Sequence, residues 1–445
     1  MAAPQVLSTP ELLSIILKHM HHEDRSRRAR RNPPGDVSLA PFYMYQDRLT
    51  PFLARAMLVD SIWFEVAADI LWKNAEINDR WKFISPIRQQ IYASRITHLR
   101  FSPGATDSSI AAHVVFLRLV SLDFGDIRFS ARWEILDRYL RPEIRTVTAR
   151  VLDGMSSHAF LDKLIERCPH LRVLGLHDIR AEDPAPELVL SLSQLVDLHT
   201  IHLIHEMTDY VNPPLMSALL GLDNLKQVFL GPGRLPCHNF YDEMKLKTLP
   251  RGLRSLRLTG GSFIFMASLL ISSDLVHLEG RIMDHGTNLF ARLINMSSIQ
   301  YLDLRWEHGT NIRARILRSL HQLSNLPWLL LDGPYGPEPK LPSRDLREND
   351  YVYIFSGLRK LRKVHLGIDS NVVFHSFVSL SESCPELTDF RIQGKCDFDD
   401  LVSNPAVPLF PYLNSKPAEL ANSSPAGAST AHVSVSSSAS CCGDS

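Results

Sequence analysis

Arginine and aromatic side chains recur through consecutive segments in the middle of the chain, in a pattern typical of a binding surface. Acidic side chains, including Glu279 and Asp303, alternate with them. Aromatic and arginine side chains supply most of the binding energy at protein interfaces, and a mixed-charge surface favours one specific partner over a generic polyanion. The alternative is that these charges only pair with one another on neighbouring strands. The candidate substrate-binding residues are Arg257, Arg281, Tyr301, Arg305 and Trp328.

Residues that could hold a metal or perform catalysis are few. His19, His21 and His22 lie close together, but histidines at a helix end without cysteines more often form a solvated terminus that the helix dipole favours. The sequence has no zinc-protease, serine-hydrolase, phosphate-loop or dinucleotide-binding motif. We therefore expect a protein that is not an enzyme and that needs no metal or cofactor.

Charge and hydropathy limit the classes of partner. The chain has 48 basic and 48 acidic residues and zero formal net charge, so nonspecific nucleic-acid binding is not expected. The basic run 25–31 could be a nuclear-localisation signal, a solvated loop or a contact to an acidic partner. No apolar run is long enough to span a bilayer, and the first residues do not resemble a signal peptide. We expect no membrane partner.

The cysteines indicate a reducing compartment. The chain has 6 cysteines, and Cys168 and Cys384 each begin a Cys-Pro-x-Leu phrase just before a predicted strand, where a small buried thiol fits better than a disulfide. The last four residues, 442–445, have the register of a prenylation signal, but Gly and Asp replace its aliphatic pair. We therefore predict a cytoplasmic or nuclear protein without a lipid anchor.

A short apolar phrase, L-x-x-L-x-L, repeats through most of the chain. Repetition at about 20–29 residues is typical of leucine-rich repeats, in which each unit contributes one short strand. We predict an α/β solenoid of about twelve strand–helix repeats. One long interval contains a Pro-rich stretch, 333–345, which is either a binding edge or a tolerated surface loop. The fourth positions of the phrases are Leu99, Leu122, Val147, Leu174, Ile201, Val228, Leu256, Leu278, Leu302, Leu329, Val364 and Phe390.

Alternation along a strand assigns side chains to two faces. The fourth and sixth positions of each phrase should point into the core, and the third, fifth and seventh positions should point to the concave face. The candidate binding residues above occupy this second set. Further members of the set are Ser255, Thr259, His277, Lys363, His365, Asp389 and Arg391.

Three regions follow along the chain. Residues 1–85 carry no repeat and are predicted to be helical, with helices opening at Ser8–Glu11 and at Thr50–Pro51. Residues 86–410 carry the repeats. Residues 411–445 are rich in Ser, Ala and Pro and are predicted to be a disordered tail.

The helical region resembles an F-box. Its opening half is Leu7-Ser-Thr-Pro-Glu-Leu-Leu-x-x-Ile-Leu17, and its closing half is Val59-x-x-x-Trp63 followed by Leu71-Trp72. The resemblance implies that Trp72 locks the last helical turn. A basic insertion at about 23–48 departs from the family, which joins its first two helices tightly. The positions implied to face a Skp-family linker protein or to form the F-box core are Leu7, Pro10, Leu12, Leu13, Ile16, Val59 and Trp63.

An F-box followed by leucine-rich repeats resembles the substrate receptors of SCF-type cullin–RING ubiquitin ligases. The resemblance implies binding to a Skp-family linker protein, and through it to a cullin, with a substrate protein held by the repeats. The alternative is a protein-binding repeat scaffold with no ubiquitin role, in which the N-terminal helices only cap the array. A third, weaker alternative is a small-ligand sensor with a pocket on the concave face.

Overall fold

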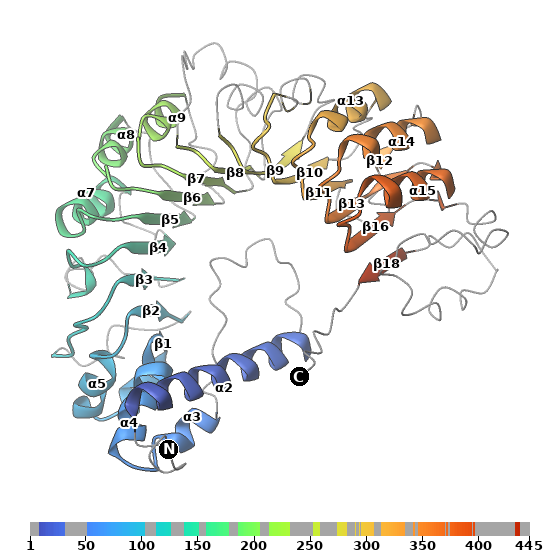
Figure 1. Ribbon diagram of the computed structural model, residues 1–445. Coiled ribbons are helices and arrows are strands. Elements are labelled where there is room, and N and C mark those ends of the chain that lie inside the picture. Colours follow the sequence, from blue (N-terminus) through green and yellow to red (C-terminus); the bar gives the residue numbers. More distant parts are fainter. Residues whose placement is uncertain are drawn as a thin grey trace. The chain divides into compact units, whose positions relative to one another are not determined.

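The repeated apolar phrase forms the parallel strands that it predicts (Figure 1). In every phrase the residue at the fourth position is buried, and the most exposed of them, Phe390, has only 6% of its surface accessible. These residues lie in register with the fourth positions of neighbouring strands, as Leu99 does with Leu122 and Leu302 with Leu329. The predicted α/β architecture with a parallel-strand repeat is therefore confirmed.

A computed structural model provides the coordinates, and the chain forms two compact units, Met1–Glu182 and Asp183–Ser445. Side chains of residues 24–31 are not described. The residues described are 9–31, 51–102, 113–125, 138–150, 157–177, 186–204, 213–231, 252–258, 274–282, 290, 293, 295–306, 313–333, 341–342, 346–369, 371–372, 374–393, 395–396 and 432–436.

In its described residues, the first unit joins a helical bundle to five parallel strands. β1 to β5 pair in chain order as far as each register is given, from Asn74↔His98 to Arg150↔His177. Its elements are α2 (Pro10–Arg31), α3 (Pro51–Ala56), α4 (Ser61–Trp72), β1 (Asn74–Ile77), η2 (Asp79–Phe83), α5 (Pro86–Ala93), β2 (His98–Phe101), β3 (Ser121–Asp123), β4 (Thr146–Arg150), α7 (Ser157–Arg167) and β5 (Val173–His177).

Two features of this unit differ from the sequence-based expectation. β1 lies inside the region predicted to be helical, and Ala75 and Ile77 bury their side chains beside Leu99 and Phe101 of β2. The strand array therefore begins one strand before the first leucine phrase. In addition, α2 continues to Arg31, so part of the basic insertion extends the first helix.

In the described residues of the second unit, eight parallel strands belong to the main sheet, with helices between several of them. β6 to β11, β13 and β16 pair in this order. Its principal elements are α8 (Pro186–Ser193), β6 (Thr200–Ile204), α9 (Pro213–Leu220), β7 (Gln227–Leu230), β8 (Ser255–Leu258), β9 (His277–Ile282), β10 (Tyr301–Trp306), α13 (Ala314–Arg318), η6 (Ser319–Gln322), β11 (Trp328–Asp332), α14 (Glu348–Gly357), β13 (Lys363–Leu366), α15 (Phe374–Ser383) and β16 (Asp389–Gln393).

Short strands occur where the sequence predicted a loop or a tail. In the Pro-rich interval, most of which lies outside the described residues, β12 (Leu341–Pro342) pairs with β14 (Ile368–Asp369). β15 (Asn371–Val372) pairs with β17 (Lys395–Cys396). Within the tail, β18 (His432–Ser436) runs antiparallel to β16, which the expectation of a wholly disordered tail did not include. The rest of the tail lies outside the described residues.

The core lies between the strands and the helices that follow them. In α7, Phe160, Leu161 and Leu164 are buried. Cys168 and Cys384 are free, buried thiols, as predicted. Burial raises the pKa of both thiols to about 12, so they stay protonated at neutral pH and are poor nucleophiles.

Candidate binding surfaces

The N-terminal helices α2, α3 and α4 enclose a small apolar core of their own. Asp60 caps α4, because its Oδ1 accepts a hydrogen bond of 2.9 Å from the backbone N–H of Trp63. This bond stabilises the start of α4 directly after the α3–α4 turn. The buried residues of this core are Leu13, Leu17, Leu53, Ala56 and Ala67.

The residues predicted to form or face a linker-binding surface divide between the core and the surface of this bundle. Their placement follows from which side of each helix packs on the other two. Leu13 is buried, Leu12, Ile16 and Trp63 are half-buried, Pro10 and Val59 are exposed, and Leu7 lies outside the described residues.

Large apolar side chains remain exposed where α3 turns into α4. Leu58, Val59 and Ile62 have 85%, 60% and 37% of their surfaces accessible, and we call these three residues the α3–α4 apolar surface. Ile15 on α2 is also exposed. Of these side chains, sequence reasoning had selected only Val59. Contiguous apolar exposure on a folded surface usually marks an interaction site.

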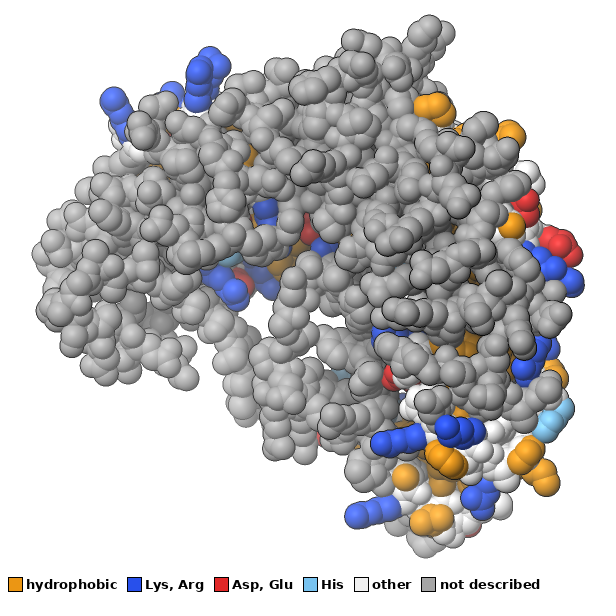
Figure 2. All heavy atoms as spheres, turned by 180° about the vertical axis from the view of Figure 1, so that it is seen from behind, with side chains coloured by type: hydrophobic (Ala, Val, Ile, Leu, Met, Phe, Trp, Pro, Cys, Tyr) orange, Lys and Arg blue, Asp and Glu red, His pale blue; other side chains and the backbone are white. Residues whose placement is uncertain are grey.

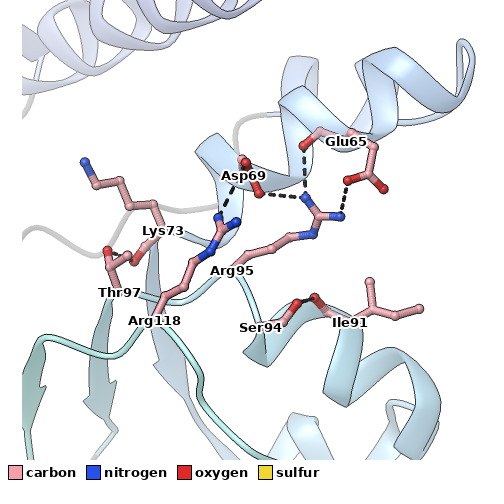
Figure 3. Close-up of polar contacts among 8 residues, drawn as sticks. All are labelled: Glu65, Asp69, Lys73, Ile91, Ser94, Arg95, Thr97 and Arg118. Atoms are coloured by element: carbon pink, nitrogen blue, oxygen red, sulfur yellow. Dashed lines mark hydrogen bonds and ion pairs between the residues drawn. The ribbon is translucent and has the colours of Figure 1, made fainter. Parts of the chain in front are cut away.

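The bundle is fastened to the first repeat by a charged network (Figure 3). Arg95, which follows α5, donates from Nη1 to Asp69 Oδ1 at 2.6 Å and to the backbone carbonyl of Glu65 at 3.2 Å, and from Nη2 to the Glu65 carboxylate. Arg118 lies farther from Asp69, at 3.8 Å. Trp72 at the end of α4 stacks on Tyr92 of α5 with ring centroids 4.2 Å apart. These contacts join α4 to the strand array.

In the second unit, alternate strand residues point away from the buried leucines, and we call this side the strand face. Four of its side chains lie in one register row across β9, β10, β11 and β13: His277, Tyr301, Trp328 and Lys363. The His277 and Tyr301 rings stack 4.0 Å apart at an interplanar angle of 5°, and Tyr301 lies 4.9 Å from Trp328. Lys363 Nζ lies 4.5 Å from the centre of the Trp328 ring. We call these four residues the aromatic row.

The neighbouring rows of the strand face consist largely of paired charges. Arg257 Nε lies 2.8 Å from Glu279 Oε1, and its guanidinium lies over the Phe229 ring. Arg305 donates two hydrogen bonds to the Asp303 carboxylate, of 3.0 and 3.1 Å. In the space-filling view, acidic and basic side chains lie side by side near the centre of the picture (Figure 2).

Burial changes the proton affinities of this face. Burial raises the pKa of the Asp303 carboxyl, although the hydrogen bonds and charge of Arg305 oppose that shift. Burial lowers the pKa of Arg305, but its bonds to Asp303 outweigh this effect and raise it overall. Burial, with nearby Asp303 and Glu279, also raises the pKa of the Tyr301 phenol, which therefore stays neutral. The phenol and the guanidinium keep their usual charges at neutral pH.

The structure brings together most of the predicted substrate-binding residues. Tyr301 and Trp328 are neighbours in the aromatic row, while Arg257 and Arg305 are held by carboxylates in the charged rows. Arg281 pairs with Arg305 through its backbone, and its side chain lies outside the described residues. Lys363 carried the same sequence signal as the arginines, but its contact with Trp328 depends on strand register.

The described residues contain no cluster of histidine, cysteine and acidic side chains that could hold a metal ion. His19 lies 3.3 Å from Glu23 one helical turn further along α2, and both side chains are exposed. This i,i+4 spacing is that of a surface pair on a helix.

Comparison with known proteins gives no match: neither a protein-family model nor a curated protein sequence matches this chain. Among the described helices, none is both long and apolar enough to cross a membrane.

Proposed function

We propose that this chain is a substrate-recognition adaptor of an SCF-type cullin–RING ubiquitin ligase. In this proposal α2, α3 and α4 bind the Skp-family linker protein, which connects the chain to a cullin, and the strand face binds a substrate protein. The ligase chemistry then belongs to other subunits. The adaptor makes the reaction between a substrate lysine and the charged ubiquitin carrier effectively intramolecular.

The observation that carries the proposal is the α3–α4 apolar surface. The bundle already has a closed core, so Leu58 and Val59 add nothing to its folding by remaining exposed. Each Å² of apolar surface that a partner covers contributes about 25 cal/mol to binding, and this favours a partner at this position. The surface also coincides with the closing half of the F-box-like sequence.

The rival function, a repeat scaffold with a helical cap, is favoured by a different observation. Arg95 and Tyr92 of the first repeat bind α4 directly, as a cap requires. The same bundle could both cap the strand array and bind a linker protein. The two functions differ in whether the exposed side of the bundle has a partner.

The test is co-purification of the full chain with the Skp-family linker. We expect a complex with the wild-type chain and at least a hundredfold weaker binding for Leu58→Asp/Val59→Asp, because two carboxylates would be buried at the interface. Leu117→Asp is the matched control, since Leu117 is 65% exposed in the same unit but outside the bundle. It should bind like the wild type.

Two outcomes favour the cap instead. The first is a folded wild-type chain that does not bind the linker. The second comes from Trp63, which is half-buried against the bundle core: if Trp63→Ala unfolds the strand array rather than only abolishing linker binding, the bundle serves chiefly as a cap. Thermal unfolding of Trp63→Ala and wild type distinguishes these results.

A further inference from the structure

We propose that the strand face recognises an acidic segment of its partner protein in which a carboxylate lies close to an aromatic or aliphatic side chain, and that Lys363 selects the carboxylate. The inference rests on the proposed function, because it specifies the chemistry of the substrate. It assigns recognition to Lys363, Trp328 and Tyr301 rather than to the arginines of the same face.

The apolar part of the site is the aromatic row. His277, Tyr301 and Trp328 present ring surface from three consecutive strands, and Trp328 has 36% of its surface exposed. Tyrosine and tryptophan lose little conformational entropy on binding and bury a large area, so they are effective anchors. A planar or aliphatic side chain of a partner would pack on Tyr301 and Trp328.

The charged part of the site is Lys363. The described arginines of this face are already matched: Arg257 lies against Glu279, Arg305 against Asp303 and Arg391 against Asp389. Among the described residues, Lys363 has no carboxylate partner, and its ammonium group lies over the Trp328 ring. Its register neighbour Asp389 directs a carboxylate oxygen to Arg391 at 3.3 Å. Among the described side chains of this face, Lys363 is therefore the cation whose charge a ligand can neutralise.

The arginines are poor candidates for the same task. Binding a substrate carboxylate to Arg305 would require loss or sharing of two hydrogen bonds to Asp303, a side chain that is almost completely buried. Breaking such a pair leaves a buried charge without compensation, which is costly. Asp332, a further described acid of this face, accepts a hydrogen bond of 2.8 Å from the backbone N–H of Gly333.

The spacing of the strands sets the size of the ligand. Neighbouring strands lie about 4.8 Å apart, so the distance from Tyr301 on β10 to Lys363 on β13 is about 10 Å. An extended peptide covers this distance in about three residues at roughly 3.3 Å for each. A segment with an apolar side chain and an acidic side chain two or three positions apart therefore fits the row. One unmatched lysine does not form a surface for long polyanions, which need several contacts to phosphate.

The experiment is selection of a random 12-residue peptide library on the full chain, in parallel with Lys363→Ala and Lys360→Ala. Lys360 is the matched control: it is an exposed lysine just before β13 that is not a member of the aromatic row, and its Nζ donates to Asn325 Oδ1 at 2.8 Å. Wild type and Lys360→Ala should enrich peptides with Asp or Glu close to an aromatic or aliphatic residue. Lys363→Ala should lose the acidic preference.

Synthetic copies of the selected peptides then give the magnitude. Lys363→Ala should weaken their binding at least tenfold, equivalent to about 1.4 kcal/mol, and Trp328→Ala should weaken it similarly. Four results would each overturn the inference. They are enrichment of neutral or basic peptides, no enrichment at all, binding of the selected peptides by Lys363→Ala as tightly as by wild type, and competition by heparin as effective as that by the selected peptides. Linker binding is measured separately. A folded chain that binds the linker but shows no preference for acidic peptides would refute this inference and leave the proposed function intact. If Trp328→Ala does not fold, Lys363→Ala decides.

Discussion

The α3–α4 apolar surface and the aromatic row both expose apolar side chains to solvent, and they differ in the charged groups that surround them. In the bundle, Leu58 and Val59 are exposed and do not belong to the apolar core. On the strand face, Tyr301 and Trp328 lie among carboxylates and guanidinium groups that neutralise one another. The first arrangement suits a partner that is bound through shape and apolar area. The second suits a partner that is chosen by charge, because Lys363 has no carboxylate partner among the described residues.

In both regions, residues that stabilise the structure lie next to residues that are available to a partner. In the bundle, neighbouring residues of one helix have opposite roles, with Leu13 inside and Ile15 outside. On the strand face, Arg257 and Arg305, two of the arginines that the sequence suggests as ligands, are paired with carboxylates within the structure. Three sets of substitutions test this separation.

The largest effect is expected in the bundle core. Leu13→Ala removes a fully buried side chain from a core of few residues and should lower the free energy of unfolding by about 3 to 5 kcal/mol. Ile15→Ala, two positions along the same helix at 63% exposure, should change it by less than about 0.5 kcal/mol. Urea unfolding followed by circular dichroism measures both. Similar losses for the two variants would refute the assignment of inside and outside.

The next effect concerns the buried pair on the strand face. Arg305→Met leaves the Asp303 carboxylate buried without its partner and should cost about 2 to 4 kcal/mol at pH 7.5. Losing Arg305 removes the opposition to burial, so the folded-state pKa of Asp303 rises further above its unfolded value. The folded state then binds the proton more tightly, and stability falls as the pH rises through that folded pKa.

The pH dependence supplies the control for this prediction. Arg305→Met should be closer to wild type at pH 4.5 than at pH 7.5, and adding Asp303→Asn should recover much of the loss at pH 7.5. Arg391→Met breaks an exposed pair with Asp389 and should cost less than about 1 kcal/mol at either pH. If Arg305→Met lowers the free energy of unfolding equally at both pH values, then Arg305 stabilises the fold through packing of its side-chain carbons and not through its charge.

The smallest effect is expected where the bundle joins the array. Arg95→Ala removes the ion pairs to Glu65 and Asp69, but both carboxylates are at least half exposed, so screening limits the loss to about 1 kcal/mol. Arg118→Ala, which removes a longer and more exposed contact to Asp69, should have no measurable effect. Thermal unfolding compares the two. A loss of several kcal/mol in Arg95→Ala would show that the junction, rather than the core, holds the bundle in place.

The sequence predicts the strands well because a leucine phrase places alternate side chains in the core at every repeat. β1 was missed since Asn74–Ile77 supplies only Ala75 and Ile77 as apolar positions and lacks the phrase. The exposed side of the bundle was harder to predict from the sequence, because α2 carries apolar residues on several sides. Periodicity alone therefore does not distinguish the exposed Ile15 from the buried Leu13. Charge pairing on the strand face depends on register between strands that are separated by intervals of unequal length.

Calorimetric titration of the full wild-type chain with the purified Skp-family linker would decide whether the N-terminal bundle binds this partner. We expect saturable one-to-one binding with a negative heat-capacity change, because the α3–α4 apolar surface is removed from water. A folded chain that gives no binding heat at several temperatures and elutes separately from the linker would contradict this expectation.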